Sequence, residues 1–223
     1  MPTLERSEDI FVLNLGETEN RFHPDWLANV NDLLDEVEKA DAPRALVTTA
    51  TGKFYSNGLD QEWMLANPSG FKEYAGKVHG LYARLLSLPL PTVAAIQGHC
   101  FAAGAMLALA HDFRVMRADR GFFCFPEVDI QIPFTPGMSA LIQARLSKQV
   151  AHESMTTGRR YGGPDALKAA IVDATAEEEA VVPTAVGLAK MLASKPGGTL
   201  ATIRERMYAD ALVLLRDTEN PLG

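Results

Sequence analysis

Hydrophobic residues recur along the first half of the chain in two alternating patterns. Short runs such as Ala45–Thr49 and Thr92–Gln97 are almost continuously apolar, which is typical of buried parallel strands. A longer segment, His23–Ala40, places apolar residues every three or four positions, which predicts an amphipathic helix. Alternating strands and helices of this kind indicate an α/β protein built from stacked units with parallel strands.

The rest of this half repeats the two patterns. Further strands are predicted over Thr3–Glu5, Ile10–Leu15 and Phe113–Met116, and further helices over Phe71–Ser87 and Gly104–Ala110. The first two strands are separated by a short polar turn, so we expect them to pair with each other.

Beyond Thr135 the chain has helical periodicity and few strand signals. Helices are predicted over Met138–Leu146, Lys148–Thr156, Pro164–Ala170, Glu177–Ala193 and Thr199–Leu215. Glycine and proline residues separate several of them, and no flexible linker or low-complexity segment occurs. We therefore expect an α/β core over residues 1–135, followed by a helical C-terminal region over residues 136–223.

The composition excludes several classes of protein. The 223 residues carry a formal net charge of −7 without a cluster of Lys and Arg, which argues against a nucleic acid or an anionic membrane as partner. Cys100 and Cys124 lack metal-ligand spacing, so neither a zinc site nor a disulfide framework is expected. The N-terminus lacks signal-peptide features, and the C-terminal ENPLG is no Ser-Lys-Leu peroxisomal signal, so a cytoplasmic location is expected.

Two loops that are rich in small residues each follow a predicted strand. They read GKFYSNGLD at 52–60 and QGHCFAAGAML at 97–107. N–H groups at helix starts lack partners and carry partial positive charge, so two facing turns could hold an oxygen that becomes negative during a reaction. Spacing alone leaves open the alternative that Gly58 and Gly104 only permit tight turns. Motifs for dinucleotides, P-loop nucleotides and a nucleophile elbow are missing from the sequence.

A third segment, FPEVDIQIPF at 125–134, places Glu127 and Asp129 among apolar residues. An apolar pocket raises the pKa of a carboxyl group, because the ionised form loses its hydration. Such a group becomes a better proton acceptor and donor near neutral pH. One of the two acids is therefore a candidate for proton transfer.

These three segments, in this order and spacing, resemble the enoyl-CoA hydratase/isomerase (crotonase) superfamily over nearly the whole chain. RRYGGPDALKAAIVDA at 159–174 also resembles a family segment, with Ala170–Ile171 in place of Gly-Leu. The resemblance implies a spiral of ββα turns with a helical C-terminal region, which is part of the same structural domain or a trimerisation subdomain. It also implies acyl-CoA thioester substrates, a homotrimer or dimer of trimers, and no metal or cofactor beyond the CoA of the substrate.

The resemblance implies a role for each motif. The backbone N–H groups of Leu59 and Ala103 would form an oxyanion hole, and Glu127 would be the catalytic acid and base. Asp129, two residues later, is expected to be structural. Substrate-binding positions by the same resemblance are Ser56, Asn57, Gly58, Gly104 and Met106.

Met106 departs from the hydratase pattern, because hydratases of this family carry a second glutamate there. A thioether cannot accept a proton or orient a water molecule as a carboxylate does. The additional aspartate of dienoyl-CoA isomerases is replaced by Thr135. A single acid at Glu127 favours a Δ3,Δ2-enoyl-CoA isomerase that acts in the β-oxidation of fatty acids. Hydration, thioester hydrolysis and a catalytically silent acyl-CoA-binding subunit stay open as alternatives.

Three further polar residues are interpreted as structural. His99 and His111 flank the second loop and its helix, where a histidine more often satisfies backbone groups than it catalyses. Arg204, near the C-terminus, is interpreted as part of a solvated helix face.

Overall fold

Two mainly parallel sheets run through the computed structural model, which describes residues 1–223. The larger sheet has the order β1-β2-β3-β5-β7-β9, and the smaller has the order β4-β6-β8. The strands of the larger sheet are β1 (Thr3–Ser7), β2 (Ile10–Asn14), β3 (Ala45–Thr49), β5 (Thr92–Ile96), β7 (Phe113–Arg117) and β9 (Ala174–Ala176). Those of the smaller sheet are β4 (Phe54–Ser56), β6 (His99–Phe101) and β8 (Phe123–Cys124).

Three successive turns of the chain each contribute one strand to the larger sheet, one strand to the smaller sheet and then helical structure. Val47 on β3 pairs with Val93 on β5, which in turn pairs with Phe113 on β7, all in parallel. In the smaller sheet Cys100 on β6 pairs with Phe123 on β8, also in parallel. The result is a spiral of ββα turns, and the predicted fold class is confirmed.

Ten α-helices surround the two sheets. They are α1 (Pro24–Lys39), α2 (Gln61–Ala66), α3 (Phe71–Ser87), α4 (Ala103–Leu109), α5 (Pro136–Arg145), α6 (Lys148–Thr157), α7 (Gly163–Lys168), α8 (Val181–Leu192), α9 (Gly197–Met207) and α10 (Ala209–Leu215). Side chains of His23, Asp60, Thr135 and Ser147 accept N-terminal hydrogen bonds of α1, α2, α5 and α6, so local polar residues decide where these helices begin.

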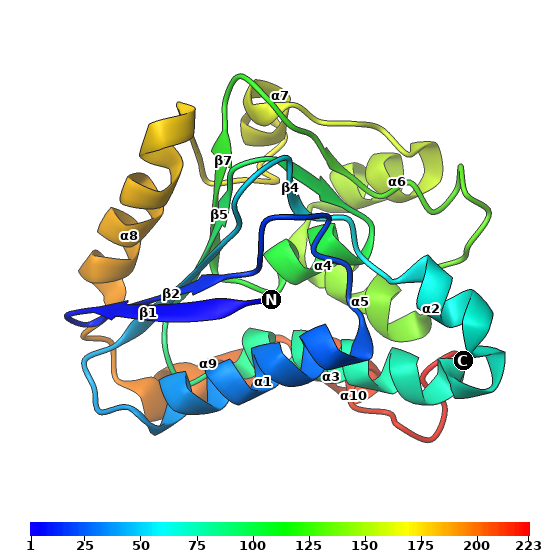
Figure 1. The fold of residues 1–223 in the computed structure, drawn as a ribbon, viewed down its shortest axis with the longest axis horizontal. Helices are drawn as coiled ribbons and strands as arrows, with labels where there is room; N and C mark the ends of the chain where they lie inside the picture. Colours follow the sequence, from blue (N-terminus) through cyan, green and yellow to red (C-terminus); the bar gives the residue numbers. More distant parts are fainter.

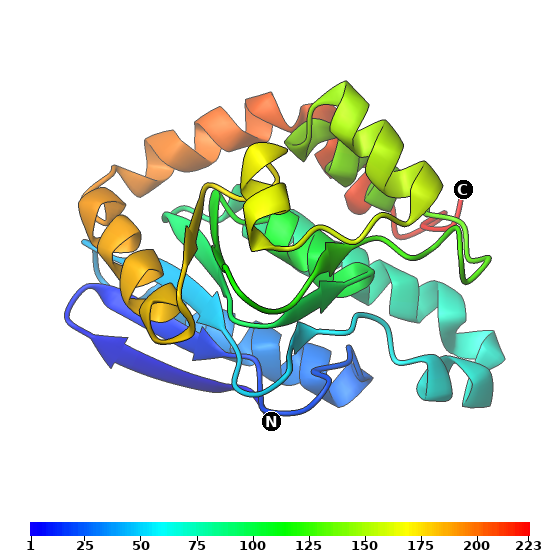
Figure 2. The same cartoon turned by 90° about the horizontal axis from the view of Figure 1, so that it is seen from above.

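Alternate residues of the larger sheet face two different helical layers. Ile10, Val47 and Val93 pack against the buried face of α8, which includes Ala185. Their neighbours, for example Leu46, instead belong to the main core, which also contains the buried faces of α1 and α3. The period of two in a strand explains this division. Figures 1 and 2 show α8 along one side of the sheet and α1 on another side of the molecule.

The structure differs from the sequence expectations in several short elements. The strands of the smaller sheet have two or three residues each, which is too short for a pattern of alternation. β9 brings the C-terminal region into the larger sheet, so that region is not purely helical. The helix predicted over Thr199–Leu215 is two helices, because the backbone at Tyr208 leaves helical geometry. The boundary at residue 135 stays a prediction, although α5 begins at Pro136.

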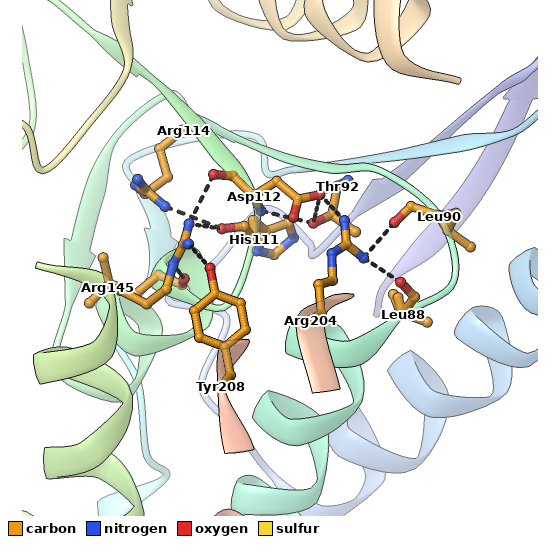
Figure 3. A network of polar contacts seen from close by, with 10 residues as sticks. Leu88, Leu90, Thr92, His111, Asp112, Arg114, Arg145, Arg204 and Tyr208 are labelled. Atoms are coloured by element: carbon orange, nitrogen blue, oxygen red, sulfur yellow. Dashed lines mark hydrogen bonds and ion pairs between the residues drawn. The ribbon is translucent and has the colours of Figure 1, made fainter. Parts of the chain in front are cut away.

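A buried polar network fastens the C-terminal helices to the core (Figure 3). Arg204 on α9 exposes 4% of its surface. It donates hydrogen bonds to the carbonyls of Leu88 and Leu90, the latter at 2.9 Å, and forms an ion pair with Asp112. The interpretation of Arg204 as a solvated residue is wrong, because its side chain is buried. The sequence did not show this, since its acceptors lie more than ninety positions away along the chain. Arg145 on α5 joins the network by donating to the carbonyls of residues 111 and 112.

None of the helices combines the length and apolar composition that a bilayer span requires.

Replacing Arg204 by Met should destabilise the protein strongly. The change leaves two buried carbonyls and a partly buried carboxylate without their cation, so we expect a loss of about 3–5 kcal/mol in the free energy of unfolding. Arg216→Met is the control, because it removes an exposed pair with Glu205 and should cost no more than about 1 kcal/mol. Urea unfolding measures both, and equal effects would contradict the role of the buried network.

Candidate active site

The two small-residue loops meet because they follow neighbouring strands. β4 and β6 are paired in parallel, so the loops at their carboxyl ends lie side by side. A Cβ atom on Gly58 would lie 2.8 Å from the nitrogen of Ala103, and a Cβ on Gly104 would lie 2.6 Å from the carbonyl oxygen of Ser56. Gly58 also has a φ of +81°, which other residues rarely adopt. Glycine at both positions is therefore what lets the two backbones touch.

The backbone N–H groups of Leu59, Ala103 and Gly104 at this contact have no hydrogen-bond acceptor within the protein, and of these residues Leu59 and Ala103 line the cavity described below. The amides of Gly58, Asp60 and Ala102 are paired and donate to acceptors at 3.1, 3.0 and 3.0 Å. Ala103 is the first residue of α4, where no intrahelical partner exists. The pair of free donors arises because the loop and the helix start face the same space.

Ala102 forms the sharp turn between β6 and α4. Its φ is 51° and its ψ is −127°, a conformation that costs a residue with a Cβ about 1–3 kcal/mol. The turn allows α4 to begin directly after the strand, with Ala103 as its first helical residue. Backbone strain at this point thus accompanies the free N–H group of the next residue.

A mainly apolar cavity lies beside the two amides, as is usual for small-molecule sites. Leu59, Ala103, Met106 and Glu127 all contribute to its wall, together with Asn57. Most of the remaining wall is apolar and comes from the helices α2, α3 and α5 and from the segment that follows Glu127. The fold therefore gathers five of the predicted site residues around one space.

Glu127 is the only carboxylate that lines this cavity. It exposes 7% of its surface, and its Oε2 atom has no hydrogen-bond partner. Burial raises the pKa of Glu127 from 4.5 to about 7, because the charged form has lost most of its hydration. At neutral pH both protonation states are populated, so the group can accept a proton and also return it.

A tight turn separates Glu127 from Asp129. The carbonyl of Pro126 accepts hydrogen bonds from the amides of Asp129 and Ile130, at 2.9 and 3.0 Å. This reversal leaves Asp129 exposed while Glu127 is buried. The carboxylate of Asp129 packs against Gly158, where a Cβ atom would lie 2.5 Å from its Oδ2. The two acids of the segment therefore lie in different surroundings, and Asp129 does not line the cavity.

Three predicted substrate-binding residues, Ser56, Gly58 and Gly104, are not among the residues that line the cavity. The hydroxyl of Ser56 is fully buried and donates to the carbonyl of Asn20 at 2.8 Å. These three residues therefore do not face the cavity. The hydrogen bond of Ser56 and the close contacts of the two glycines hold in place the loops whose other residues line it. No group of three or more His, Cys, Asp or Glu side chains is arranged to hold a metal ion.

Residues of α3 and its surroundings form part of the site that sequence reasoning missed. Tyr74 lines the cavity, and its hydroxyl accepts a hydrogen bond from the amide of Asp60 at 3.0 Å. Thr135 also lines it and is hydrogen-bonded to Nε2 of His79 at 2.8 Å. Burial lowers the pKa of His79 to about 4, so this histidine is neutral at pH 7. The only sequence signal was the amphipathic pattern of α3, which marks a buried face without saying what it faces.

The unpaired carboxylate of Glu127 should reduce stability at neutral and higher pH. The folded state holds this proton up to about pH 7 whereas an ordinary value is 4.5, so stability falls as the pH rises through this interval and levels off above it. Gln has the same shape without the charge. We expect Glu127→Gln to be more stable than the wild type at pH 8 by about 3 kcal/mol, and this advantage to disappear near pH 4.

Denaturant unfolding of both proteins at pH 4, 6 and 8 measures this difference. Asp129→Asn is the matched control, because that side chain is exposed and its replacement should not produce the same pH dependence. An advantage of Glu127→Gln that is constant with pH would contradict burial as the cause of the shift.

Comparison with known proteins identifies the family. The sequence profile of the enoyl-CoA hydratase/isomerase family matches residues 5–218. Enoyl-CoA delta isomerase 3 of Arabidopsis thaliana is 39% identical over 234 residues, covering 100% of this chain and 98% of the relative. The peroxisomal enoyl-CoA delta isomerase 2 of the same plant is 40% identical over 231 residues, covering 96% of this chain and 95% of the relative.

Solved structures agree with these sequence matches. The crystal structure of a probable enoyl-CoA hydratase from Mycobacterium tuberculosis superimposes with a TM-score of 0.92 and 26% sequence identity, covering 99% of this chain and 94% of that one. The resemblance seen in the three sequence motifs is therefore confirmed. The chain belongs to the enoyl-CoA hydratase/isomerase family.

Proposed function

We propose that this protein is a Δ3,Δ2-enoyl-CoA isomerase. The observation that carries the proposal is a single buried carboxylate, Glu127, in the same apolar cavity as the unpaired N–H groups of Leu59 and Ala103. The two Arabidopsis relatives named as enoyl-CoA delta isomerases support it. An acyl-CoA thioester is the expected ligand, and no cofactor beyond its CoA enters the reaction.

In the proposed reaction Glu127 first removes a proton from C2 of a 3-enoyl-CoA. The electrons move toward the thioester carbonyl, and the resulting enolate oxygen accepts hydrogen bonds from the amides of Leu59 and Ala103. Glu127 then returns the proton to C4, which leaves the double bond between C2 and C3. Atoms and charge balance without another reactant, and the product suits the β-oxidation of unsaturated fatty acids.

Two features of the site would accelerate this reaction. Each preorganised donor to a developing oxyanion contributes a factor of roughly 10²–10³ in rate. Both donors are backbone groups on rigid turns, so they need no reorganisation when the charge develops. Glu127, with a pKa of about 7, is close to the optimum for a group that accepts and donates a proton at neutral pH.

Hydration of a 2-enoyl-CoA is the second candidate, because the structural neighbour from Mycobacterium tuberculosis is named a probable hydratase. Syn addition of water needs one group to activate the water and another to supply a proton. Met106 is fully buried in the cavity wall, and its thioether can do neither. The absence of a second carboxylate at the cavity therefore favours isomerisation.

Incubation of the purified protein with 3-enoyl-CoA and, separately, with 2-enoyl-CoA tests the proposal. We expect conversion of the first to the 2-enoyl isomer and no hydration of the second. Glu127→Gln should reduce kcat by a factor of about 10²–10⁴, because the amide cannot accept the proton. Acyl-CoA binding should persist in this variant, since the cavity keeps its shape.

The pH dependence provides an independent check. Only ionised Glu127 can act as the base, so kcat/KM should fall about tenfold per pH unit below the pKa of about 7. Hydration without isomerisation would overturn the proposal. Binding of acyl-CoA without any turnover would instead identify a catalytically silent binding subunit.

Gly104→Ala tests whether the contact between the two loops is needed for catalysis. The added Cβ would lie 2.6 Å from the Ser56 carbonyl oxygen, so the loops must move apart. The N–H groups of Leu59 and Ala103 would then no longer be placed to donate to the same oxygen atom. We expect kcat to fall by roughly 10² or more, as for the loss of one oxyanion donor. The control is Gly80→Ala on α3, where no atom lies within 4 Å of the added Cβ. Similar kcat values for the two variants would show that the loop contact is unimportant for catalysis.

Exposed apolar residues on the last two helices support the expected homotrimer or dimer of trimers. Ile203 and Met207 lie one turn apart on α9 and expose 49% and 65% of their surfaces, and Val213 on α10 exposes 71%. Exposed apolar side chains next to each other are typical of association surfaces. Both cysteines are free and buried, which suits the reducing conditions of the proposed cytoplasmic location.

A further inference from the structure

One face of the smaller sheet carries a cluster of aromatic rings. His99 and Phe101 on β6 point to the same side of the strand, because they are two residues apart, and Cys100 between them is buried. The ring of Phe54 on β4 lies 5.4 Å from that of His99 and 6.5 Å from that of Phe101. Phe122, just before β8, adds a fourth ring at 5.7 Å from His99. Together these four rings form the aromatic face.

The aromatic face is accessible to solvent and separate from the catalytic cavity. Phe122 exposes 39% of its surface, and the other three residues are partly exposed. None of the four lines the cavity that contains Glu127. The proposed reaction therefore leaves this cluster of rings without a role.

Three cations border the aromatic face. Nζ of Lys53 and the guanidinium carbon of Arg160 lie over two of its rings, at 5.2 and 6.0 Å from the ring centres. Partial burial and the charges of Lys53, Arg120 and Arg160 lower the pKa of His99. Arg120 is therefore the third cation near this ring, and the imidazole itself is neutral at pH 7.

None of these three cations forms an ion pair within the protein. The carboxylates of neighbouring segments are bound by other residues: Arg117 pairs with Asp119, and Arg159 pairs with Glu153 and Asp165. Unpaired positive charge thus remains beside the aromatic face, in a chain whose net charge is −7.

This combination of groups suits contact with another protein. Aromatic and arginine side chains are enriched in the centres of protein–protein interfaces. The rings of the aromatic face pack on one another across paired strands, so they lose little freedom when a partner binds. Rings bordered by unpaired cations are complementary to a segment whose carboxylates flank apolar side chains.

Charge argues against two other occupants. A second copy of this chain that docked through the same face would bring the three cations opposite their own kind, which is repulsive. A nucleic acid gains its affinity from many phosphate contacts, whereas this face offers three cations on a protein with a net charge of −7. Complementarity therefore favours an acidic protein segment.

We infer that the aromatic face and the cations Lys53, Arg120 and Arg160 form a docking site for an acidic segment of a partner protein, with apolar side chains between its carboxylates. The site lies outside the catalytic cavity, so docking needs no acyl-CoA. This inference is independent of the proposed function.

A fluorescent peptide in which single Phe residues separate pairs of Glu tests the docking site by anisotropy. We expect the full-length protein to bind this peptide and not the same peptide with Gln in place of Glu. Lys53→Glu combined with Arg160→Glu should raise the dissociation constant by at least about tenfold, because attraction becomes repulsion. Phe122→Ser should raise it about fivefold, as the loss of an apolar interface contact does.

A matched control separates the site from overall charge. Lys148→Glu combined with Lys195→Glu changes the net charge by the same amount at two exposed positions without ion pairs, and should bind the peptide as the wild type does. Neither pair of substitutions should change isomerase activity or the oligomeric state measured by analytical ultracentrifugation.

Several outcomes would overturn the inference. No binding of the Glu peptide, or equal binding of the Gln peptide, would show that the face does not recognise carboxylates. Equal weakening by the two pairs of substitutions would show an effect of net charge alone. A changed oligomeric state in the Lys53→Glu and Arg160→Glu protein would assign the face to contact between copies. Tighter binding of polyuridylate or of phosphatidylserine vesicles than of the peptide would assign it to a nucleic acid or a membrane.

Two further results separate this inference from the proposed function. Displacement of the peptide by free CoA, or loss of isomerase activity in the Lys53→Glu and Arg160→Glu protein, would assign the face to the substrate and overturn the inference. Peptide binding by a wild type that does not isomerise 3-enoyl-CoA would support the inference and refute the proposed function alone.

Discussion

The contact between two backbones at the carboxyl ends of β4 and β6 is the constraint on which the site depends. Parallel pairing brings the loops together, and glycine at 58 and 104 lets them approach to a distance at which any Cβ would collide with main-chain atoms. This approach brings the free amides of Leu59 and Ala103 to the wall of one cavity. A spiral fold produces such a contact naturally, since successive turns place equivalent loops next to each other.

A buried chain of hydrogen bonds connects the elements that carry these loops. The Nδ1 atom of His111 lies 2.9 Å from the carbonyl of Leu107, which can only accept, so Nδ1 carries the proton. Nε2 therefore accepts from the hydroxyl of Thr48 at 2.9 Å, and Thr48 accepts from Tyr55 at 2.7 Å. Burial lowers the pKa of His111 to about 4, which keeps this direction at neutral pH. β3, β4 and α4 are thus joined by satisfied polar groups inside an apolar core.

The sequence was informative where one residue type implies one conformation or one chemistry. Short apolar runs predicted β2, β3, β5 and β7 of the larger sheet, whereas β9 was not predicted. The position of Glu127 among apolar residues predicted a buried acid. The short strands of the smaller sheet were missed because two or three residues carry no period. The burial of Arg204 and the contribution of Tyr74 to the cavity depend on partners distant in sequence, and a single chain without its fold does not show such partners.

Burial of Glu127 has two consequences that cannot be separated. The same loss of hydration that brings its pKa to about 7 removes stability from the folded protein wherever the group is ionised. A second carboxylate at position 106 would share this apolar space, and repulsion between two nearby charges would raise the pKa of at least one acid further. Met106 avoids that penalty and fills the wall with apolar volume instead. A cavity with one acid and two fixed donors is therefore the more stable arrangement, and it retains the groups that proton transfer through an enolate requires.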